Sequence, residues 1–226
     1  MAIWHAKNYY GYTKSSVEGW DNIQLIYSNL IRRGFSEASS CGVLVNMENE
    51  SGFNPWSWEN QQIMASTDWS IIDSSMVHGY GLCGWTPSGK YLHDNWNNLG
   101  LYPSTFRGFA PNYSDIPGNA SDGHAQCIMI VEGQRYNWIT SGSGRVNVSW
   151  YDFRSITDPE WAAEVWCRNY EYPANLDREV AERRAGVSWY YDRLYGTDPV
   201  HDPIEDISAP LVLLLKKAIE NNSNIY

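Results

Sequence analysis

Two glutamates stand close together in the stretch NMENESGFNPW, residues 46–56, and a carboxyl group can serve as a proton donor in catalysis. Glu48 and Glu50 end an apolar run and are followed at once by Ser51 and Gly52. If the run is helical, each residue turns by about 100°, so the two side chains lie about 200° apart. The spacing therefore predicts that these glutamates do not act as a pair in one cleft.

Glu50 is the better candidate because it lies in the last turn before Gly52. There the negative end of the helix dipole opposes ionisation, and an apolar wall would raise the pKa of the carboxyl group further. A carboxylic acid that stays protonated near neutral pH suits cleavage of a glycosidic bond, because the leaving oxygen must receive a proton. The alternative is an ordinary helix-end glutamate in water.

The helix that must position Glu50 is predicted to begin after Ser36, a good N-cap, and to end before Gly52. Nearly every residue from Ala38 to Met47 is small or apolar, which is typical of a helix buried on most faces. The catalytic candidate therefore lies at the end of a helix that we expect to run through the core.

The rest of the chain is also predicted to be mainly helical. Helical spacing and end signals occur over residues 17–33, 159–172 and 176–196, with Asp158 as a cap and Pro173 as a stop. Residues 125–140 fit either a helix or a strand. Residues 54–90 are rich in Trp, Ser, Asn and Gly and are predicted to form loops and short strands, and a short apolar helix is expected in the tail near residues 211–220.

Composition limits the partners of this chain. Its 226 residues carry a net charge of -10, which argues against a nucleic-acid partner and gives no support for binding to an acidic membrane. Twelve Trp and sixteen Tyr suit sugar rings, but they suit interfaces and cores as well. No apolar run approaches about 18 residues, and the first residues contain no apolar region of signal-peptide length. We therefore expect no membrane span and no signal peptide.

The cysteines and histidines show no metal-ligand spacing, so we expect no metal and no cofactor. Widely spaced cysteines are typical of buried free thiols. The four are Cys41, Cys83, Cys127 and Cys167.

Three blocks of the sequence resemble a known family. ESGFNP, followed by GYGLCGW, is similar to the lysozyme and lytic transglycosylase superfamily. The resemblance is closer to the phage tail lysozyme family, including the tail-tip lysozyme domain of small Bacillus podophages. The blocks are Cys41–Pro55, Gly79–Pro87 and Tyr170–Asn175, in the family's order. They leave the insertion-like residues 57–78 uncovered.

The resemblance implies an α+β, mainly helical fold: a lysozyme-like two-lobed domain with a buried catalytic helix and a small β-rich lobe. We expect an N-terminal arm over residues 1–16, the catalytic domain over 17–195 and a C-terminal tail over 196–226. The family's catalytic acid falls on Glu50, whereas the family position of Glu48 need not be acidic. This agrees with the argument from helix faces.

The positions of other residues in the sequence suggest the remaining site candidates, with packing of the small lobe as the alternative for Tyr80 and Trp85. The candidates for substrate binding are Tyr80, Gly81, Trp85, Thr86 and Tyr170. A second carboxylate would lie about 5–9.5 Å from the acid, and Asp68 or Asp73 is the candidate, with a solvated loop aspartate as the alternative for each. Glu171 is a further carboxyl group near the cleft, but we prefer a structural pair with an arginine for it.

One position departs from the superfamily pattern. The turn often carries Gln two residues after its Leu, and this chain has Gly84 there. The function of that side chain would then fall to Cys83, Trp85 or a water molecule, or the subsite would be changed.

The family resemblance implies a bacteriophage glycosidase that cleaves the β-1,4 bond between N-acetylmuramic acid and N-acetylglucosamine in peptidoglycan. A lytic transglycosylase would use the same Glu50. The expected location is the virion tail, where the enzyme would breach the host wall and contact other tail proteins, although an enzyme released late in infection by a holin is the other route to the wall.

Two different classes remain as alternatives. One is a cysteine amidase or peptidase with Cys41 as nucleophile and His124 or His78 as base. The other is a non-enzymatic virion or sugar-binding protein that retains a lysozyme fold.

Overall fold

The structure is a computed structural model that describes residues 1–6, 11–55, 57, 79, 81–86, 121–133 and 137–202. Several predictions therefore fall outside the described residues: Asp68, Asp73, His78, Tyr80, most of the expected β-rich lobe and the apolar segment of the tail. The remaining predictions lie within the described part of the chain.

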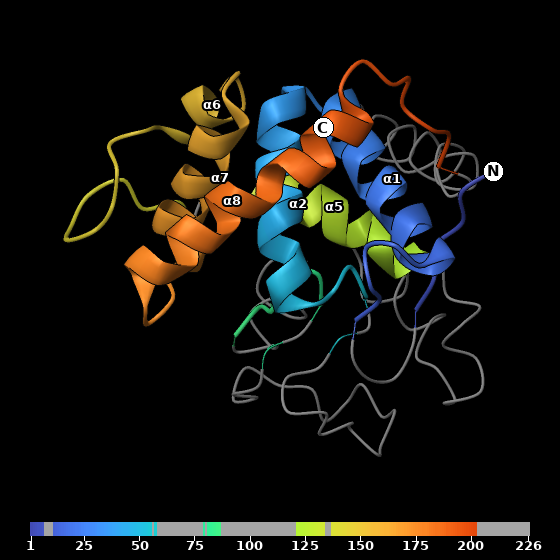
Figure 1. The fold of residues 1–226 in the computed structure, drawn as a ribbon, viewed down its shortest axis with the longest axis horizontal. Helices are drawn as coiled ribbons and strands as arrows, with labels where there is room; N and C mark the ends of the chain where they lie inside the picture. The colour runs from blue at the N-terminus through green and yellow to red at the C-terminus, as the bar shows by residue number, and fades with distance from the viewer. Residues whose placement is uncertain are drawn as a thin grey trace, which may run out of the picture.

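The described residues are mainly helical, as predicted (Figure 1). The elements are α1 Val17–Arg32, α2 Glu37–Glu50, α5 Ser121–Gly133, α6 Trp150–Phe153, α7 Pro159–Trp166, the π-helix η6 Cys167–Glu171 and α8 Leu176–Leu194. The segment that fitted either a helix or a strand is thus helical in α5. Among the described residues, no helix is both long and apolar enough to cross a bilayer.

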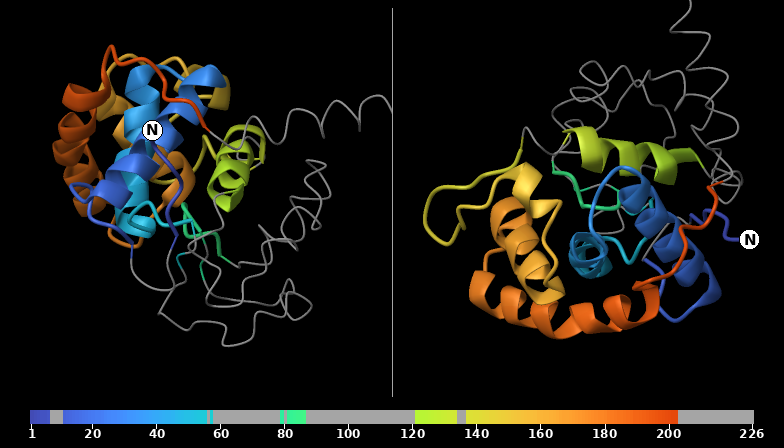
Figure 2. Two further views of the ribbon diagram at one scale, coloured as in Figure 1. Left: turned by 90° about the vertical axis from the view of Figure 1, so that its right-hand side faces the viewer. Right: turned by 90° about the horizontal axis from the view of Figure 1, so that it is seen from above.

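Helix α2 lies at the centre of this arrangement. Every residue from Ala38 to Met47 is buried, which confirms the prediction of a core helix. The helix packs against α1, α7 and α8, and Figure 2 shows it end-on with these helices and α5 around it. Gly42 permits the close approach of α7, because a Cβ atom there would lie 2.7 Å from the carbonyl carbon of Ala162.

The helix starts follow from side-chain caps. Ser16, Ser36 and Asp158 each accept a hydrogen bond from a backbone N–H in the first turn of α1, α2 and α7. These starts agree with the sequence. The end of α7 differs from the prediction, because the chain changes to a π-helix after Trp166. Tyr172 then adopts a left-handed conformation just before Pro173.

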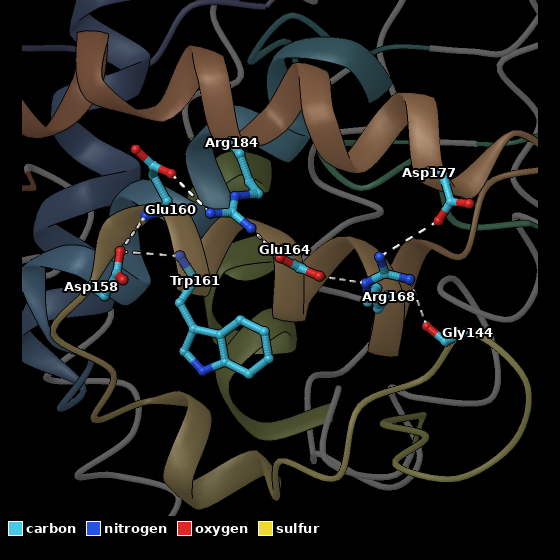
Figure 3. A network of polar contacts seen from close by, with 8 residues as sticks. All are labelled: Gly144, Asp158, Glu160, Trp161, Glu164, Arg168, Asp177 and Arg184. Carbon is cyan, nitrogen blue, oxygen red and sulfur yellow. Dashed lines mark hydrogen bonds and ion pairs between the residues drawn. The ribbon is translucent and has the colours of Figure 1, made fainter.

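A network of charged side chains joins α7, η6 and α8 (Figure 3). Arg184 of α8 contacts Glu160 at 3.1 Å and Glu164 at 2.8 Å, both on α7. Arg168 of η6 contacts Glu164 at 2.7 Å and donates to the carbonyl oxygen of Gly144. Because Glu164 is shared between two arginines, the network fixes η6 relative to both helices.

The two ends of the described chain pack onto the helices. Trp4, in the predicted arm, is 3% exposed, and its indole N–H donates to the carboxylate of Asp202 in the predicted tail. Asp202 is fully buried and also accepts from the Asn29 side chain at 2.8 Å, while Nδ1 of His124 lies 2.9 Å away. The predicted boundaries of arm and tail stay a prediction, but their described residues contribute to the core.

Candidate active site

The two glutamates at the end of α2 have different surroundings. Glu48 accepts a hydrogen bond from the Tyr190 hydroxyl at 2.6 Å and is paired with the Lys14 ammonium at 3.1 Å. Glu50 is exposed in the last turn of the helix, and its carboxylate lies against the turn 81–86. The contacts of Glu48 are with α8 and the arm, so they agree with the argument that the two side chains lie on different faces.

Gly84 makes the closest described approach to Glu50. Its φ is +55°, and a Cβ atom added there would lie 2.9 Å from Oε2 of Glu50. This backbone region disfavours other residues, and the space that a side chain needs is already taken by the carboxylate. The departure from the superfamily's Gln therefore has a local reason, because the glycine admits the Glu50 side chain.

Hydrogen bonds from two helices hold the turn 81–86 in place. The Ser51 hydroxyl, one residue after Glu50, donates to the carbonyl oxygen of Leu82 at 2.9 Å. The backbone N–H of Leu82 donates to Oε1 of Gln126 at 2.7 Å, and Nε2 of Gln126 donates to the carbonyl oxygen of Pro55 at 2.7 Å. Figure 1 shows the turn beside the C-terminal end of α2.

Gln126 is a site residue that the sequence reasoning missed. It is fully buried in α5, where its side chain connects the turn 81–86 with the chain after α2. The only sequence signal is an amide side chain in an otherwise apolar run, because a buried amide must find partners for its polar atoms.

The structure describes four of the five predicted substrate-binding residues. Gly81 has a φ of +77° and begins the turn, and Thr86 is exposed at its end. Trp85 is 6% exposed, and its indole lies near the hydroxyl of Tyr170, which is partly buried on η6. The burial of Trp85 favours a role in shaping the turn over stacking on a sugar.

Glu171, the residue after Tyr170, is a second carboxyl group near Glu50. Its Oε1 accepts a hydrogen bond from the indole N–H of Trp166 at 2.9 Å. Burial raises the pKa of Glu171 well above its usual value, and the negative charge of Glu50 raises it further. The sequence reasoning preferred a pair with an arginine here, but Arg183, whose charge acts on Glu171, has its described ion pair with Glu179 at 2.7 Å.

The cysteine alternative has little support in the described residues. All four cysteines are free and buried, as predicted. Burial, with a smaller contribution from the charge of Glu37, raises the pKa of Cys41 to about 12. The thiolate that a nucleophile requires is therefore scarce at neutral pH, and the candidate base His124 is close to Asp202.

The sequence of this chain is similar to known phage proteins. The chain is similar to "Morphogenesis protein 1" of Bacillus phage B103, with 26% identity over 203 residues. That match covers 86% of this chain and 44% of the relative, so the chain spans less than half the length of the curated relative. The sequence pattern of the phage tail lysozyme family matches residues 21–194, a range that includes Glu50, the turn 81–86 and Glu171. The chain therefore belongs to the phage tail lysozyme family.

Proposed function

We propose that this chain is a peptidoglycan-degrading glycosidase of a bacteriophage, with Glu50 as its general acid. The observation that carries the proposal is the exposed Glu50 carboxylate at the end of the buried helix α2, with the turn 81–86 directly against it. Family membership supports peptidoglycan as the substrate. The proposed bond is the β-1,4 linkage between N-acetylmuramic acid and N-acetylglucosamine.

In the proposed reaction Glu50 protonates the oxygen of the sugar that leaves. This stabilises the leaving group while positive charge develops at the anomeric carbon. Gly84 lets the backbone of the turn lie close to the acid, and Thr86 is exposed at the end of the same turn. The Ser51 hydroxyl, one residue after the acid, donates to the carbonyl oxygen of Leu82 and joins the end of α2 to the turn.

The test compares wall lysis by Glu50→Gln with lysis by the wild type. Removal of a general acid costs about a hundredfold or more in rate, so we expect the variant to clear bacterial cell walls at least that much more slowly. Glu182→Gln is the matched control, because Glu182 lies exposed on α8 and makes its described ion pair with Arg178. If Glu50→Gln clears walls as fast as this control, Glu50 is not the acid.

Mass spectrometry of the digested wall identifies the reaction. Reducing-end muramic acid means hydrolysis, whereas an anhydro end means that the sugar's own hydroxyl has attacked, as in a lytic transglycosylase. We expect hydrolysis. If the wild type releases no muropeptides, the chain is a non-enzymatic protein with this fold.

We also propose that the chain acts as part of a phage tail and opens the host wall during infection. The family and the name of the Bacillus phage relative support this location. Contacts with other tail proteins belong to the same proposal.

A further inference from the structure

Both ends of the Gln126 amide bond to backbone groups near the end of α2. Its Oε1 accepts the backbone N–H of Leu82 at 2.7 Å, and its Nε2 donates to the carbonyl oxygen of Pro55 at 2.7 Å. The Gln126 side chain is fully buried, so water does not compete for either contact. Because buried polar groups are destabilised when they lose a partner, the two contacts together favour one position of the amide.

Leu82 is held through both of its backbone polar groups. Its N–H donates to Gln126 on α5, and its carbonyl oxygen accepts the hydroxyl of Ser51 at 2.9 Å. Ser51 directly follows Glu50. The peptide groups around Leu82 therefore connect α5 to the end of the helix that carries the proposed acid.

Two glycines bring the turn 81–86 into contact with both the amide and the acid. A Cβ atom at Gly81 would lie 2.6 Å from Oε1 of Gln126, and a Cβ atom at Gly84 would lie 2.9 Å from Oε2 of Glu50. The backbone N–H of Gly84 donates to the carbonyl oxygen of Gly81 at 3.1 Å and closes the turn between these two contacts. A shift of the turn at Gln126 would therefore move the backbone that lies against Glu50.

Helix α5 gives Gln126 a fixed base. A Cβ atom at Gly123 would lie 2.3 Å from the ring of Trp4, and Nδ1 of His124 lies 2.9 Å from Oδ2 of Asp202. His124 and Gln126 are two residues apart, so they point to opposite sides of the helix. One side of α5 is thus attached to the two described ends of the chain, and the other side carries the amide that reaches the turn.

We propose that Gln126 is a positioning residue of the active site: its amide sets where the turn 81–86 lies against the Glu50 carboxylate, and it must both accept and donate a hydrogen bond to do so. The inference rests on the function proposed for Glu50. Gln126 acts through the turn and not on the substrate, because its side chain is fully buried. Gly84 has no side chain that could hold the turn from within, and the amide from α5 supplies that support.

The first test compares two buried amides that make the same kind of contact. Asn169 is also fully buried, accepts the N–H of Val146 at 2.9 Å and donates to the carbonyl oxygen of Val146 at 2.8 Å. Gln126→Met and the control Asn169→Leu each remove both bonds and keep a side chain of similar size. Both variants are expected to unfold more easily than the wild type.

The two variants are then compared in activity per folded molecule, with soluble glycan fragments of peptidoglycan as substrate. A displacement of about 1 Å in a catalytic group can cost a hundredfold in rate, so we expect Gln126→Met to lose roughly tenfold or more in kcat. Its KM is expected to change little, and Asn169→Leu is expected to keep the wild-type kcat. Equal kcat values for the two variants would mean that Gln126 only stabilises the fold, and would overturn the proposal.

Gln126→Glu tests the need for a donor. A protonated carboxyl group can donate to Pro55 and accept from Leu82 as the amide does, whereas a carboxylate can only accept. We therefore expect kcat near the wild-type value while the introduced group is protonated, and a fall relative to the wild type as pH rises and the group ionises. Carbon NMR of the labelled carboxyl group follows its ionisation in the same pH series. A kcat ratio that is equal in the two ionisation states overturns the proposal.

Hydrogen exchange tests the contact without substrate. The backbone N–H of Leu82 is expected to exchange at least about tenfold faster in Gln126→Met than in the wild type, because its acceptor is gone. In Asn169→Leu its exchange is expected to stay unchanged relative to the wild type, once global stability is taken into account. An unchanged rate in Gln126→Met would show that the amide does not hold the turn.

The proposal for Gln126 and the function proposed for Glu50 fail in different ways. If Glu50→Gln clears walls as fast as its control Glu182→Gln, Glu50 is not the acid, whatever the Gln126 variants do. If Glu50→Gln loses lysis while Gln126→Met keeps the wild-type kcat, Glu50 remains the acid and Gln126 has no positioning role.

Discussion

The position of the Glu50 carboxylate depends on a residue that has no side chain. Gly84 combines a positive φ with a Cβ position 2.9 Å from Oε2 of Glu50. Gly196, just after α8, also has a positive φ, 70°, but nothing lies within 4 Å of its Cβ position. The two glycines therefore separate backbone strain from the clash with the carboxylate.

Gly84→Ala is predicted to reduce lysis more than it reduces stability. A left-handed conformation costs an alanine about 1–2 kcal/mol, and this cost applies equally to Gly196→Ala. Only Gly84→Ala also displaces the acid, and a displacement of about 1 Å can cost a hundredfold in rate, so we expect a loss of roughly tenfold or more. Lysis is measured per folded molecule, with the folded fraction taken from thermal unfolding. Equal lysis by the two variants would contradict this role of Gly84.

At the scale of the elements, Glu48 joins three parts of the chain that the sequence leaves far apart. It lies on α2, accepts from Tyr190 on α8 and pairs with Lys14, which precedes α1. The Lys14 ammonium also lies 5.2 Å from the ring centre of Trp189. Glu48 thus has a structural environment, which leaves Glu50 as the glutamate available for chemistry.

Tyr190→Phe is predicted to weaken this junction without loss of lysis by the folded protein. The change removes a hydrogen bond to a charged acceptor, and because Glu48 is 29% exposed we expect the free energy of unfolding to fall by only about 1 kcal/mol. Tyr195→Phe, at a tyrosine that is 60% exposed, serves as the control and is expected to change little. Urea denaturation measures both. Equal stabilities of the two variants would disprove the stabilising role of the Tyr190–Glu48 hydrogen bond, and a selective loss of lysis would place Tyr190 in the site.

At the scale of the whole molecule, the described ends of the chain meet in one buried polar cluster. Asp202 accepts hydrogen bonds from Trp4, 198 residues away, and from Asn29 of α1, and it lies beside His124 of α5. One carboxylate thus ties the arm, the tail and two helices together. The helix α5 that is held there also carries Gln126, which supports the turn beside Glu50.

Asp202→Asn is predicted to destabilise the whole fold. The amide would present a donor where the carboxylate accepts from the Trp4 indole and the Asn29 amide, and a buried polar group left without a suitable partner costs about 1–3 kcal/mol. The control is Asp198→Asn, because Asp198 is exposed in the same segment. Calorimetry is expected to show a clearly lower melting temperature for Asp202→Asn alone. Similar melting temperatures for the two variants would mean that the cluster does not hold the ends together.

The sequence by itself determined most of the helices and the separation of the two glutamates onto different faces of α2. The starts of α1, α2 and α7 follow from Ser16, Ser36 and Asp158, and the separation of Glu48 from Glu50 follows from the helical turn. All of these depend on residues within a few positions of one another, so their physical causes are present in the local sequence. The burial of α2 followed in the same way from its composition.

Only the tertiary structure decided what surrounds Glu50. Gly84 beside the carboxylate, Gln126 beneath the turn and Glu171 on η6 come from segments that chain folding brings together. The change from α7 to η6 was also absent from the local pattern, which predicted one continuous helix. No local pattern specifies these features, because the space left for a side chain, the partner of a buried amide and the pKa of a carboxyl group depend on atoms that packing supplies from distant parts of the chain.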